Sequence, residues 1–428
     1  MSGQVTVTAS GVRPYAVAGS PLLCDAREHG LTGDGTTNDQ PALAALVDQL
    51  GDAFAADGRA RVIYCPPGVY AIRDAGTVWR SGVSLMGAGP GATRFTNCVA
   101  VGNATIGIFL EMHYPDRLQP RGMRIANCHA ESNRFGISDW GADGLIVTGC
   151  TMTGNLEAGF QVSAKGTTGV PGKGGLLTNC VIDGNLRDGV NIGNTVGPYT
   201  VRGNRITGNG RHGYHHQDLG DGDRAAAEEI VIESNDIWGN SRDGIRFDRP
   251  LRDAVIINNR IRNNGSQCTP AASGGGESVR YTRNTVIDQS ADWPADGHRG
   301  KVLRVGHRYA VVAANDATTL TLAPIRPDDA SNWSADTPPP GTPYELPAAP
   351  AARAGITVNA TADSVTIRGN LIRDSGSATQ THGIWVTDRG NCADCRVLDN
   401  DLDGNGTSIR ADVPADGGRW SGNHGHQS

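Results

Sequence analysis

Three charged or titratable side chains near the middle of the chain could act together on one substrate. His215, Arg246 and Asp248 each lie in a short run that follows a glycine, Gly213 or Gly244. A histidine can serve as a base, an arginine can neutralise an anion, and a carboxylate can orient either one. If the two runs form neighbouring strands, about 4.8 Å apart, these groups reach one substrate. The trio therefore predicts proton abstraction next to a carboxylate or carbonyl, with His215 as base, Arg246 as anion holder and Asp248 as orienting group.

Further polar and aromatic residues are expected on the same face of the molecule. A merely solvated strand face usually carries Thr, Ser, Lys and Glu in no order, whereas amides, charged groups and tryptophans share this one. Amides would bind hydroxyls, tryptophan rings would offer apolar platforms, and a lysine in the Gly-rich loop 164–175 would act from a lid. The candidate substrate-binding residues are Trp140, Gln161, Lys165, Asn191, Arg211, Gln217, Asp218 and Trp385.

Three histidines between positions 212 and 216 suggest a metal site at first sight. However, successive side chains of a strand point to opposite faces, so His215 and His216 cannot both bind one ion there. His216 is expected to face the interior together with Tyr214. No metal is predicted at this run.

A sequence repeat must position these residues. Its units begin at Cys128, Cys150, Cys180, Asn204, Asn235 and Asn259, in steps of 22, 30, 24, 31 and 24 residues, and each start is followed five residues later by an asparagine. The repeat returns at Asn370 and Asn400, with Ser375 and Asn405 in the fifth place. Periods of this size indicate a solenoid. Short alternating apolar runs, without any helical period, indicate that its units are strands.

Stacking of the units in phase would place identical positions above one another. The asparagines would then form amide rows along the stack, and Cys128, Cys150 and Cys180 would be small buried residues in such a row. After most of these glycines the first and third residues are apolar, as in Ile245 and Phe247. They should face the interior, and the second and fourth residues should face outward.

The repeats resemble the right-handed parallel β-helix of the pectate-lyase superfamily. Residues 24–40 (CDAREHGLTGDGTTNDQ), 62–70 (VIYCPPGVY) and 87–93 (GAGPGAT) are similar to the entry segment of its pectate-lyase-3-like and phage-tailspike-like members. The resemblance implies an all-β fold, a single-stranded right-handed parallel β-helix (solenoid) with an N-terminal capping helix and an inserted small β subdomain. It selects no reaction, because lyases, hydrolases, epimerases and adhesins share this fold.

The stretch 209–214 (NGRHGY), together with 187–190 (RDGV), resembles the corresponding coils of mannuronan C5-epimerases. The resemblance implies that Arg211 and His212 bind substrate. The family's Tyr-Gly-Phe-Asp-Pro-His phrase would fall on 158–163, which reads AGFQVS and lacks the Tyr, the Asp and the His. Epimerisation of alginate by that machinery is therefore not expected. Neither the aspartates and Gly-His-Gly of polygalacturonases nor the calcium-binding acids of the lyases are evident.

The chain divides into four parts along its length. Residues 1–60 form a lead-in and a capping helix from about residue 38 to 55, which in the resembling family covers the first coil. Residues 61–264 form coils, and 265–354 an interrupted coil in which 279–288 resumes the helix before a small β subdomain projects and walls one side of a groove. Residues 355–428 restore the coils and end in a frayed tail after Asp412.

Composition excludes several functions. The chain of 428 residues has 59 glycines, 5% aromatic residues and a net charge of −6 with dispersed Lys and Arg. This predicts one elongated domain without a nucleic-acid groove or a membrane-surface patch. The start shows no export signal, so a cytoplasmic location is expected, with a virion-borne or trimmed secreted form as the alternative. Only Cys392 and Cys395 have metal-like spacing, without a second pair. No cofactor is predicted, and calcium lacks a clear ligand cluster.

The leading hypothesis is a lyase or epimerase acting on a sugar acid. One alternative is a glycoside hydrolase that pairs Asp248 with Asp218 or Asp139. Another is a cytoplasmic enzyme that tailors or cyclises a small metabolite, and a third is a tailspike-like glycan binder without activity. The partner is therefore a saccharide or a small molecule, and the oligomeric state is left open. An open outward face would favour a polymer, and a roofed one a small molecule.

Overall fold

The computed structural model describes residues 2–5, 23–57, 59, 61–66, 68–71, 83–86, 94–96, 99–101, 106–111, 122–163, 174–193, 197–218, 226–266, 271–306, 308–323, 337–348, 353–376, 379–390, 392, 394–412 and 419–425.

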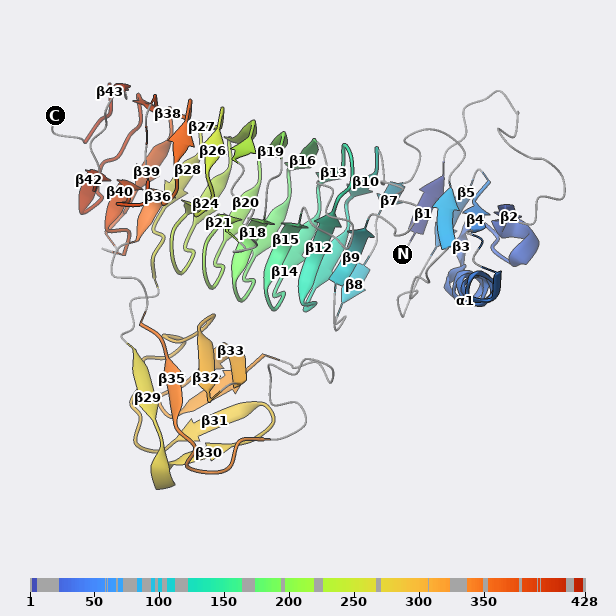
Figure 1. Cartoon of the computed structure of the whole chain (residues 1–428), viewed down its shortest axis with the longest axis horizontal. Coiled ribbons are helices and arrows are strands. Elements are labelled where there is room, and N and C mark those ends of the chain that lie inside the picture. Colours follow the sequence, from blue (N-terminus) through green and yellow to red (C-terminus); the bar gives the residue numbers. More distant parts are fainter. Residues whose placement is uncertain are drawn as a thin grey trace.

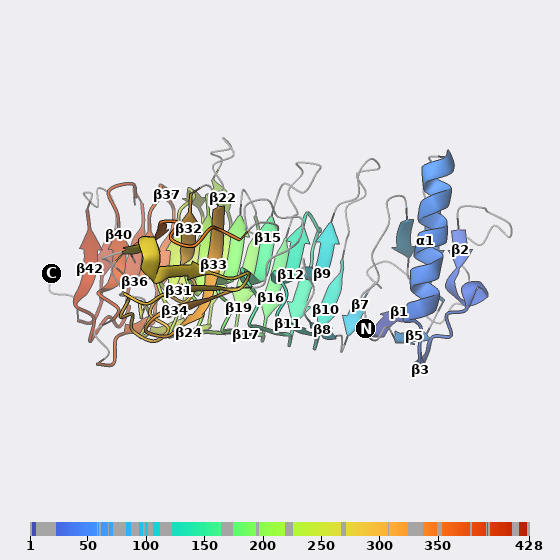
Figure 2. The same ribbon diagram turned by 90° about the horizontal axis from the view of Figure 1, so that it is seen from below.

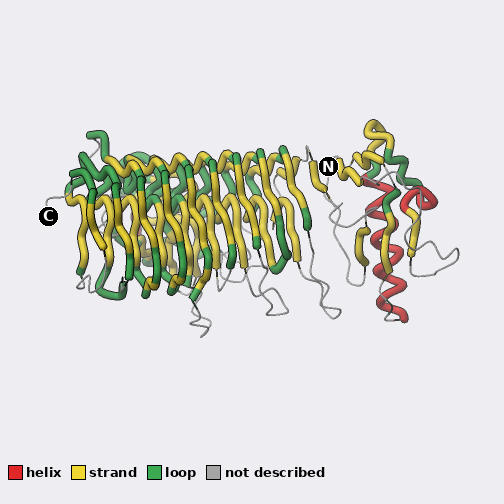
Figure 3. Tube along the Cα trace, turned by 90° about the horizontal axis from the view of Figure 1, so that it is seen from above, coloured by secondary structure: helices red, strands yellow, loops and turns green. Residues whose placement is uncertain are grey.

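Three long sheets run side by side along the molecule, and between residues 94 and 386 each successive coil adds one strand to each sheet (Figures 1 and 3). The first sheet is, in order, β3 (Asp34–Asn38), β5 (Gly68–Ala71), β1 (Ser2–Val5), β7 (Arg94–Thr96), β10 (Arg124–Ala126), β13 (Ile146–Thr148), β16 (Gly175–Thr178), β19 (Tyr199–Arg202), β23 (Ile230–Glu233), β27 (Val255–Ile257), β38 (Thr366–Arg368), β41 (Arg396–Leu398) and β43 (Arg419–Ser421). The second is β39 (Leu371–Arg373), β28 (Arg260–Arg262), β24 (Asp236–Trp238), β20 (Arg205–Thr207), β17 (Val181–Asp183), β14 (Thr151–Thr153), β11 (His129–Glu131) and β8 (Val99–Val101).

The third sheet carries the candidate site. It is, in order, β42 (Thr407–Ala411), β40 (His382–Val386), β36 (Ala354–Val358), β25 (Ile245–Phe247), β21 (Tyr214–Gln217), β18 (Asp188–Gly193), β15 (Ala158–Ser163), β12 (Phe135–Trp140) and β9 (Ile106–Glu111). Its strands all pair in parallel, so a residue lies beside its equivalents in the coils before and after it. A short fourth row consists of β22 (Ala227–Glu228), β26 (Leu251–Arg252) and β37 (Ala362–Asp363).

The lumen of the coils is filled as the alternating pattern predicts. Ile137, Phe160, Val190, Ile245 and Phe247 are fully buried in one hydrophobic core that runs along the stack. Polar residues lie between them on the opposite face of the same strands. His216 is fully buried, and its Nδ1 lies 3.4 Å from the Tyr214 hydroxyl, so the expectation that both face the interior is confirmed.

The asparagines form hydrogen-bonded rows at the turns. The backbone N–H and the Nδ2 of Asn204 both donate to Asn235 Oδ1, at 2.9 and 3.0 Å, and Nδ2 also donates to the Leu177 carbonyl. The cysteines occupy the same row, with the Cys150 N–H 3.4 Å from Cys180 Sγ. The predictions of asparagine rows and of buried cysteines within one of them are therefore confirmed. In the other row Gln380, rather than Ser375, follows Asn264.

The N-terminal part has its own small core. α1 (Gln40–Asp57) lies at this end of the stack and packs against β4 (Arg61–Tyr64) and β6 (Val83–Met86), which form a sheet with β2 (Leu23–Asp25) (Figure 2). The 3-10 helix η1 (Ala26–His29) precedes it. No helix in the described ranges is both long and apolar enough to cross a membrane.

The insertion is a separate antiparallel sheet below the C-terminal half of the coils (Figures 1 and 2). It consists of β29 (Ala272–Gly274), the 3-10 helix η2 (Gly276–Ser278), β30 (Val279–Tyr281), β31 (Thr285–Asp288), β32 (Val302–Val305), β33 (Arg308–Asn315), β34 (Thr319–Leu322) and β35 (Tyr344–Leu346). The expectation that 279–288 resumes a coil is wrong, because β30 and β31 pair with each other as a hairpin around the insertion's own core.

Two contacts place the insertion beside the turns that lead into the third sheet. Arg299 donates from Nη2 to the Gly184 carbonyl at 2.8 Å and from Nη1 to the Gly208 carbonyl at 3.4 Å. At the C-terminal end of the stack β43 pairs with β41, so residues 419–421 continue the first sheet, and the expectation of a frayed tail is wrong for them.

Candidate active site

His215 and Arg246 are neighbours on the outer face of the third sheet. In the parallel register Asn191 of β18 lies beside His215 of β21, which lies beside Arg246 of β25. Their neighbours along each strand are buried in the lumen. The repeat thus brings together residues from three coils, as its phase predicts.

The glycine that opens each run breaks the alternation of side chains. Asp188 accepts a hydrogen bond from Asn191 Nδ2 at 2.7 Å, and Asp243 accepts one from Arg246 Nη1 at 3.1 Å. Residues i and i+3 of a regular strand point to opposite faces. Because these pairs meet, the residue before the glycine lies on the outer face as well.

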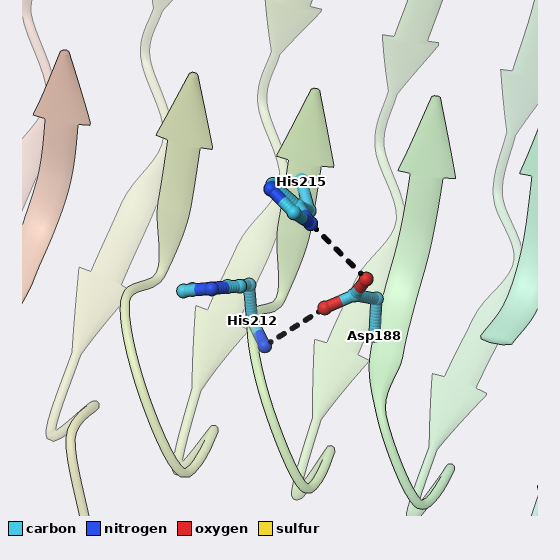
Figure 4. A group of neighbouring side chains, drawn as sticks. All are labelled: Asp188, His212 and His215. Atoms are coloured by element: carbon cyan, nitrogen blue, oxygen red, sulfur yellow. Dashed lines mark hydrogen bonds and ion pairs between the residues drawn. The ribbon is translucent and has the colours of Figure 1, made fainter. Parts of the chain in front are cut away.

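Asp188 is the centre of a buried ion cluster (Figure 4). Its Oδ1 accepts from Arg211 Nε at 2.7 Å and from the backbone N–H of His212 at 3.2 Å, and its Oδ2 contacts Arg211 Nη2. Although burial opposes ionisation of this carboxyl, the charges of Arg211 and His215 and their hydrogen bonds hold its pKa well below the usual range. Asp188 is therefore an anion, and its charge in turn raises the pKa of Arg211 against the effect of burial.

Both ring nitrogens of His215 contact protein groups. Nε2 lies 2.9 Å from Asp248 Oδ2, and Nδ1 lies 3.0 Å from Arg211 Nη2 and 3.3 Å from Asp188 Oδ2. Nδ1 can accept a hydrogen bond from Arg211, which only donates, or donate one to the Asp188 carboxylate, which only accepts. The residue is only 3% exposed. His215 lies on the outer face as expected, but the expectation that it is accessible to substrate there is wrong, because its own charged partners cover the ring.

Asp248 and Arg246 are the members of the cluster that reach solvent, with side chains 22% and 20% exposed. Arg246 Nε donates to both carboxylate oxygens of Asp248, at 3.0 and 2.9 Å, and Asn359 Nδ2 donates to Oδ1 at 2.6 Å. Burial opposes ionisation of the Asp248 carboxyl, but the hydrogen bonds from His215 and Arg246 lower its pKa. The nearby carboxylates raise the pKa of Arg246.

Asp188, His212 and His215 are the group that could hold a metal, since their ligand atoms lie within 4.8 Å of one another. The ring centroids of the two histidines are 4.8 Å apart. However, Arg211 already neutralises Asp188, and the Asp243 N–H donates to His212 Nδ1 at 3.2 Å. Burial lowers the pKa of His212 well below its usual value, so the ring is neutral. An ion would have to displace Arg211, so these residues fit an ion-pair network better than a metal centre.

The candidate amides bind one another along the outer face. Asn191 Nδ2 also donates to Gln217 Oε1 at 2.9 Å, and Gln161 Oε1 accepts from Ser138 Oγ at 2.8 Å. Trp140 Nε1 lies 3.5 Å from the same Gln161 oxygen. These contacts fix the orientation of the side chains on the side of the cluster toward β12.

Trp140 and Trp385 lie at opposite ends of this row, each three strands from His215. Trp140 packs edge-on against Phe109 with ring centroids 5.1 Å apart. Trp385 Nε1 donates to Asp412 Oδ2 at 2.8 Å. Both rings are half-buried, so each keeps part of its surface at the solvent.

The remaining candidates are scattered. Asp218 is exposed immediately after β21, and Lys165 lies outside the described residues. Asp139 occupies a lumen position, in register with Val162, and cannot pair with Asp248 on the outer face as the hydrolase alternative requires. Burial raises its pKa to about 6.

The alternation rule missed Asp188 and Asp243, because it assigns no outward position to the residue before the glycine. One signal could have identified them. The triplet Arg-x-Gly recurs at Arg187, Arg211 and Arg242, with Asp, His and Asp in the middle place. The charge of Arg211 lowers the pKa of Arg187, and burial, followed by Arg211, lowers that of Arg242 to about 10. Positive charge is thus concentrated along the row of turns that precede β18, β21 and β25.

Residues 72–220 match the family model described as right handed beta helix region. The chain is a right-handed parallel β-helix. The resemblance to such proteins is thereby confirmed. No curated protein matches the chain.

Several solved structures are similar in shape. The A-module of mannuronan C-5 epimerase AlgE6 from Azotobacter vinelandii has 17% identity and a TM-score of 0.47, covering 94% of this chain and 98% of that one. The catalytic unit of a GH87 alpha-1,3-glucanase from Streptomyces thermodiastaticus has 12% identity and a TM-score of 0.44, covering 99% and 71%. The surface adhesin PfbA of Streptococcus pneumoniae has 13% identity and a TM-score of 0.39, covering 91% and 86%. Their functions differ, and these values are too low to transfer any of them to this chain.

Proposed function

We propose that this β-helix is a carbohydrate-active enzyme that abstracts a proton next to the carboxylate of an acidic saccharide, giving β-elimination or epimerisation. The observation that carries the proposal is the chain of contacts from His215 Nε2 through Asp248 to Arg246, which joins a histidine–carboxylate pair to a partly exposed cation. This combination suits proton transfer at a carbon beside a negative charge.

Asp248 is the acceptor of the proton in this proposal. His215 has no ring nitrogen free and is almost fully covered, whereas Asp248 reaches solvent. His215 positions the carboxylate through Nε2, and the buried Asp188 and Arg211 hold the ring from the other side. The role of base that the sequence suggests for His215 thus passes to its partner.

Arg246 holds the substrate anion. Its contacts with Asp243 and Asp248 use three of its five N–H groups among the described residues, which leaves donors for a carboxylate. A substrate that draws Arg246 toward itself weakens the interaction that keeps the pKa of Asp248 low. Binding would therefore make Asp248 a stronger base. The row of Arg187, Arg211 and Arg242 adds positive charge near the site.

The reaction follows from these roles. Asp248 takes the proton from the carbon next to the substrate carboxylate, and the C–H electron pair moves into an enolate-like anion whose oxygens Arg246 neutralises. In elimination, the electron pair forms a C=C bond with the next carbon and expels the group bound there. In epimerisation, the anion is instead protonated at the same carbon from the opposite face. Hydrolysis is less well supported, because it needs a carboxyl group with a raised pKa on the outer face, and Asp139 lies in the lumen.

Oligomers of mannuronate, guluronate and galacturonate test the proposal. Elimination produces the ultraviolet absorbance of a C=C bond conjugated to the carboxylate, and epimerisation in D₂O incorporates deuterium at the reacting carbon. Asp248→Asn should lower turnover by about 100-fold or more, because it removes the general base. The control is Asp363→Asn, an exposed aspartate on β37. Release of reducing ends without absorbance, or full turnover by Asp248→Asn, would refute the proposal, and glycan binding without turnover would indicate a binder.

A further inference from the structure

The pairing of residues i and i+3 on the outer face recurs two strands away from the cluster. In register, Asp243 and Arg246 of one coil are followed by Ala354 and Thr357, and then by His382 and Trp385 of β40. The ring centroids of His382 and Trp385 are 5.7 Å apart at 66°. Two strand spacings put this pair about 10 Å from Arg246. The same local geometry thus places a histidine and a tryptophan on the site's own face.

His382 is a buried polar side chain that has no hydrogen-bond partner among the residues that the structure describes. It is 8% exposed, and neither ring nitrogen is hydrogen-bonded to any of them. Burial lowers the pKa of the ring, and the nearby Thr381 carbonyl offsets this only in part. The neutral ring therefore offers one donor and one acceptor. The hydroxyl of Thr357, in the coil between His382 and Arg246, is also buried and has no partner within the described part of the chain. Such groups are rare in proteins and require an explanation, such as a bound ligand.

Trp385 is a rigid platform with a cation beside it. The indole N–H donates to Asp412 Oδ2 at 2.8 Å, and Arg410 Nε donates to the other oxygen of Asp412, also at 2.8 Å. The Arg410 guanidinium carbon lies 5.3 Å from the centroid of the Trp385 ring, and its side chain is 46% exposed. An aromatic face, a neutral imidazole and a cation together match a pyranose ring that carries hydroxyls and a carboxylate.

We propose that Trp385, His382 and Arg410 form a binding subsite for a second residue of an acidic oligosaccharide whose reacting residue lies at Asp248 and Arg246. This inference rests on the proposed function. Hydrogen bonds run from Asp248 toward β40, since Asn359 Nδ2 donates to Asp248 and Asn359 Oδ1 accepts at 2.6 Å from Oγ1 of Thr387, the residue after β40. The pyranose ring of this second sugar residue stacks on Trp385. One of its hydroxyls exchanges hydrogen bonds with His382, and its carboxylate pairs with Arg410.

The subsite implies a substrate longer than one sugar. A single uronate occupies Arg246 alone, whereas an oligomer that follows the helix axis also reaches Trp385. Trp385→Ala should therefore lower kcat/KM for long substrates more than for short ones, because only long substrates reach its ring.

The test measures binding by calorimetry in the Asp248→Asn background, with monomers and hexamers of mannuronate, guluronate and galacturonate and with neutral glucose oligomers. Trp385→Ala should weaken hexamer binding roughly ten-fold and monomer binding by less than about two-fold, and Trp385→Phe should recover most of the affinity. His382→Ala should weaken hexamer binding by a few-fold. The control is Trp238→Ala on the second sheet, whose ring lies 4.9 Å from the guanidinium of Arg262.

Each outcome decides the proposal. Equal hexamer affinity in Trp385→Ala and Trp238→Ala overturns the subsite, and so does the failure of every oligosaccharide to bind. Binding of acidic hexamers that depends on Trp385, without turnover in the unmodified chain, supports the subsite and rejects the proposed reaction. If only neutral oligomers bind, and their binding depends on Trp385, the result supports a sugar-binding subsite and contradicts the proposal that the substrate is acidic.

Discussion

Asp188 is the residue on which the rest of the ion cluster depends. It is buried and pairs with Arg211, whose side chain is 13% exposed, so removal of its charge deprives this guanidinium of its hydrogen-bonded carboxylate. Asp188→Asn should therefore destabilise the chain by about 3 kcal/mol at neutral pH. The denaturant midpoint of unfolding measures this, with the exposed Asp363→Asn as a control whose effect should stay within about 0.5 kcal/mol.

The same variant should change the acid sensitivity of the protein. The folded-state pKa of Asp188 lies well below the value in the unfolded chain, about 3.9. Its stabilisation is therefore fully present above about pH 4 and is lost as pH falls toward the folded-state pKa. The difference between the midpoints of the unmodified chain and Asp188→Asn should be largest near neutral pH and shrink below about pH 4. A constant difference down to about pH 2 would show that the charge of Asp188 does not stabilise the fold.

How much of the site could be predicted varies from residue to residue. The adjacency of His215 and Arg246 follows from the phase of the repeat alone, because parallel strands in register place equivalent positions side by side. The partners Asp188 and Asp243 do not follow, because the alternation of side chains is interrupted at Gly189 and Gly244, so that residues i and i+3 meet on one face. Burial of His215 was not predictable either, since it results from side chains that three different coils contribute.

At the level of the turns, each row of buried amides connects one coil to the next. The sequence predicts these rows well, because the offset of five residues is constant and every member has the same environment. It also shows that cysteine and asparagine exchange at one position of the repeat. The amide makes the better link, since Cys150 N–H and Cys180 Sγ are 3.4 Å apart, whereas Cys180 N–H reaches Asn204 Oδ1 at 2.9 Å.

Cys180→Asn should therefore be stabilising. The new Oδ1 would accept from the Cys150 N–H, and the new Nδ2 would donate to Asn204 Oδ1, as Asn204 itself does to Asn235. We expect the free energy of unfolding to increase by about 1 kcal/mol, which the midpoint of thermal or urea unfolding measures. Cys180→Val keeps a similar volume without polar atoms and should lose stability. If both variants unfold at the same midpoint, packing and not the amide row determines stability at this position.

For the whole molecule, the repeat predicts the coil stack and fails for the insertion. The small β subdomain that the sequence predicts is present, and its strands 302–305, 308–315 and 319–322 have a clear alternating pattern. The same pattern over 279–288 reads like another coil, and nothing local distinguishes a strand that joins the stack from one that pairs in a hairpin. The partner of a strand depends on residues far away in the chain, here those that build the insertion's own core.

The insertion is held against the coils by a close contact between backbones, and this predicts a specific effect. Gly300 has φ +77°, and a Cβ there would lie 2.5 Å from the Leu186 carbonyl and 2.6 Å from that of Gly210. Gly300→Ala should therefore push the insertion away from the turns that carry Asp188 and Arg211, and amide hydrogen exchange in 184–187 and 208–211 should become faster. Gly306→Ala is the matched control, because Gly306 has φ +61° and no atom within 4 Å of the added Cβ.

The two variants share the backbone strain of a left-handed alanine, about 1 kcal/mol, so a difference between them reports the contact alone. Exchange in the lumen strands, such as β18 and β21, should stay slow in both variants, because the coil core does not include the insertion. If the turns exchange equally in Gly300→Ala and Gly306→Ala, the insertion does not brace the site, and Asp188 and Arg211 are positioned by the coil stack alone.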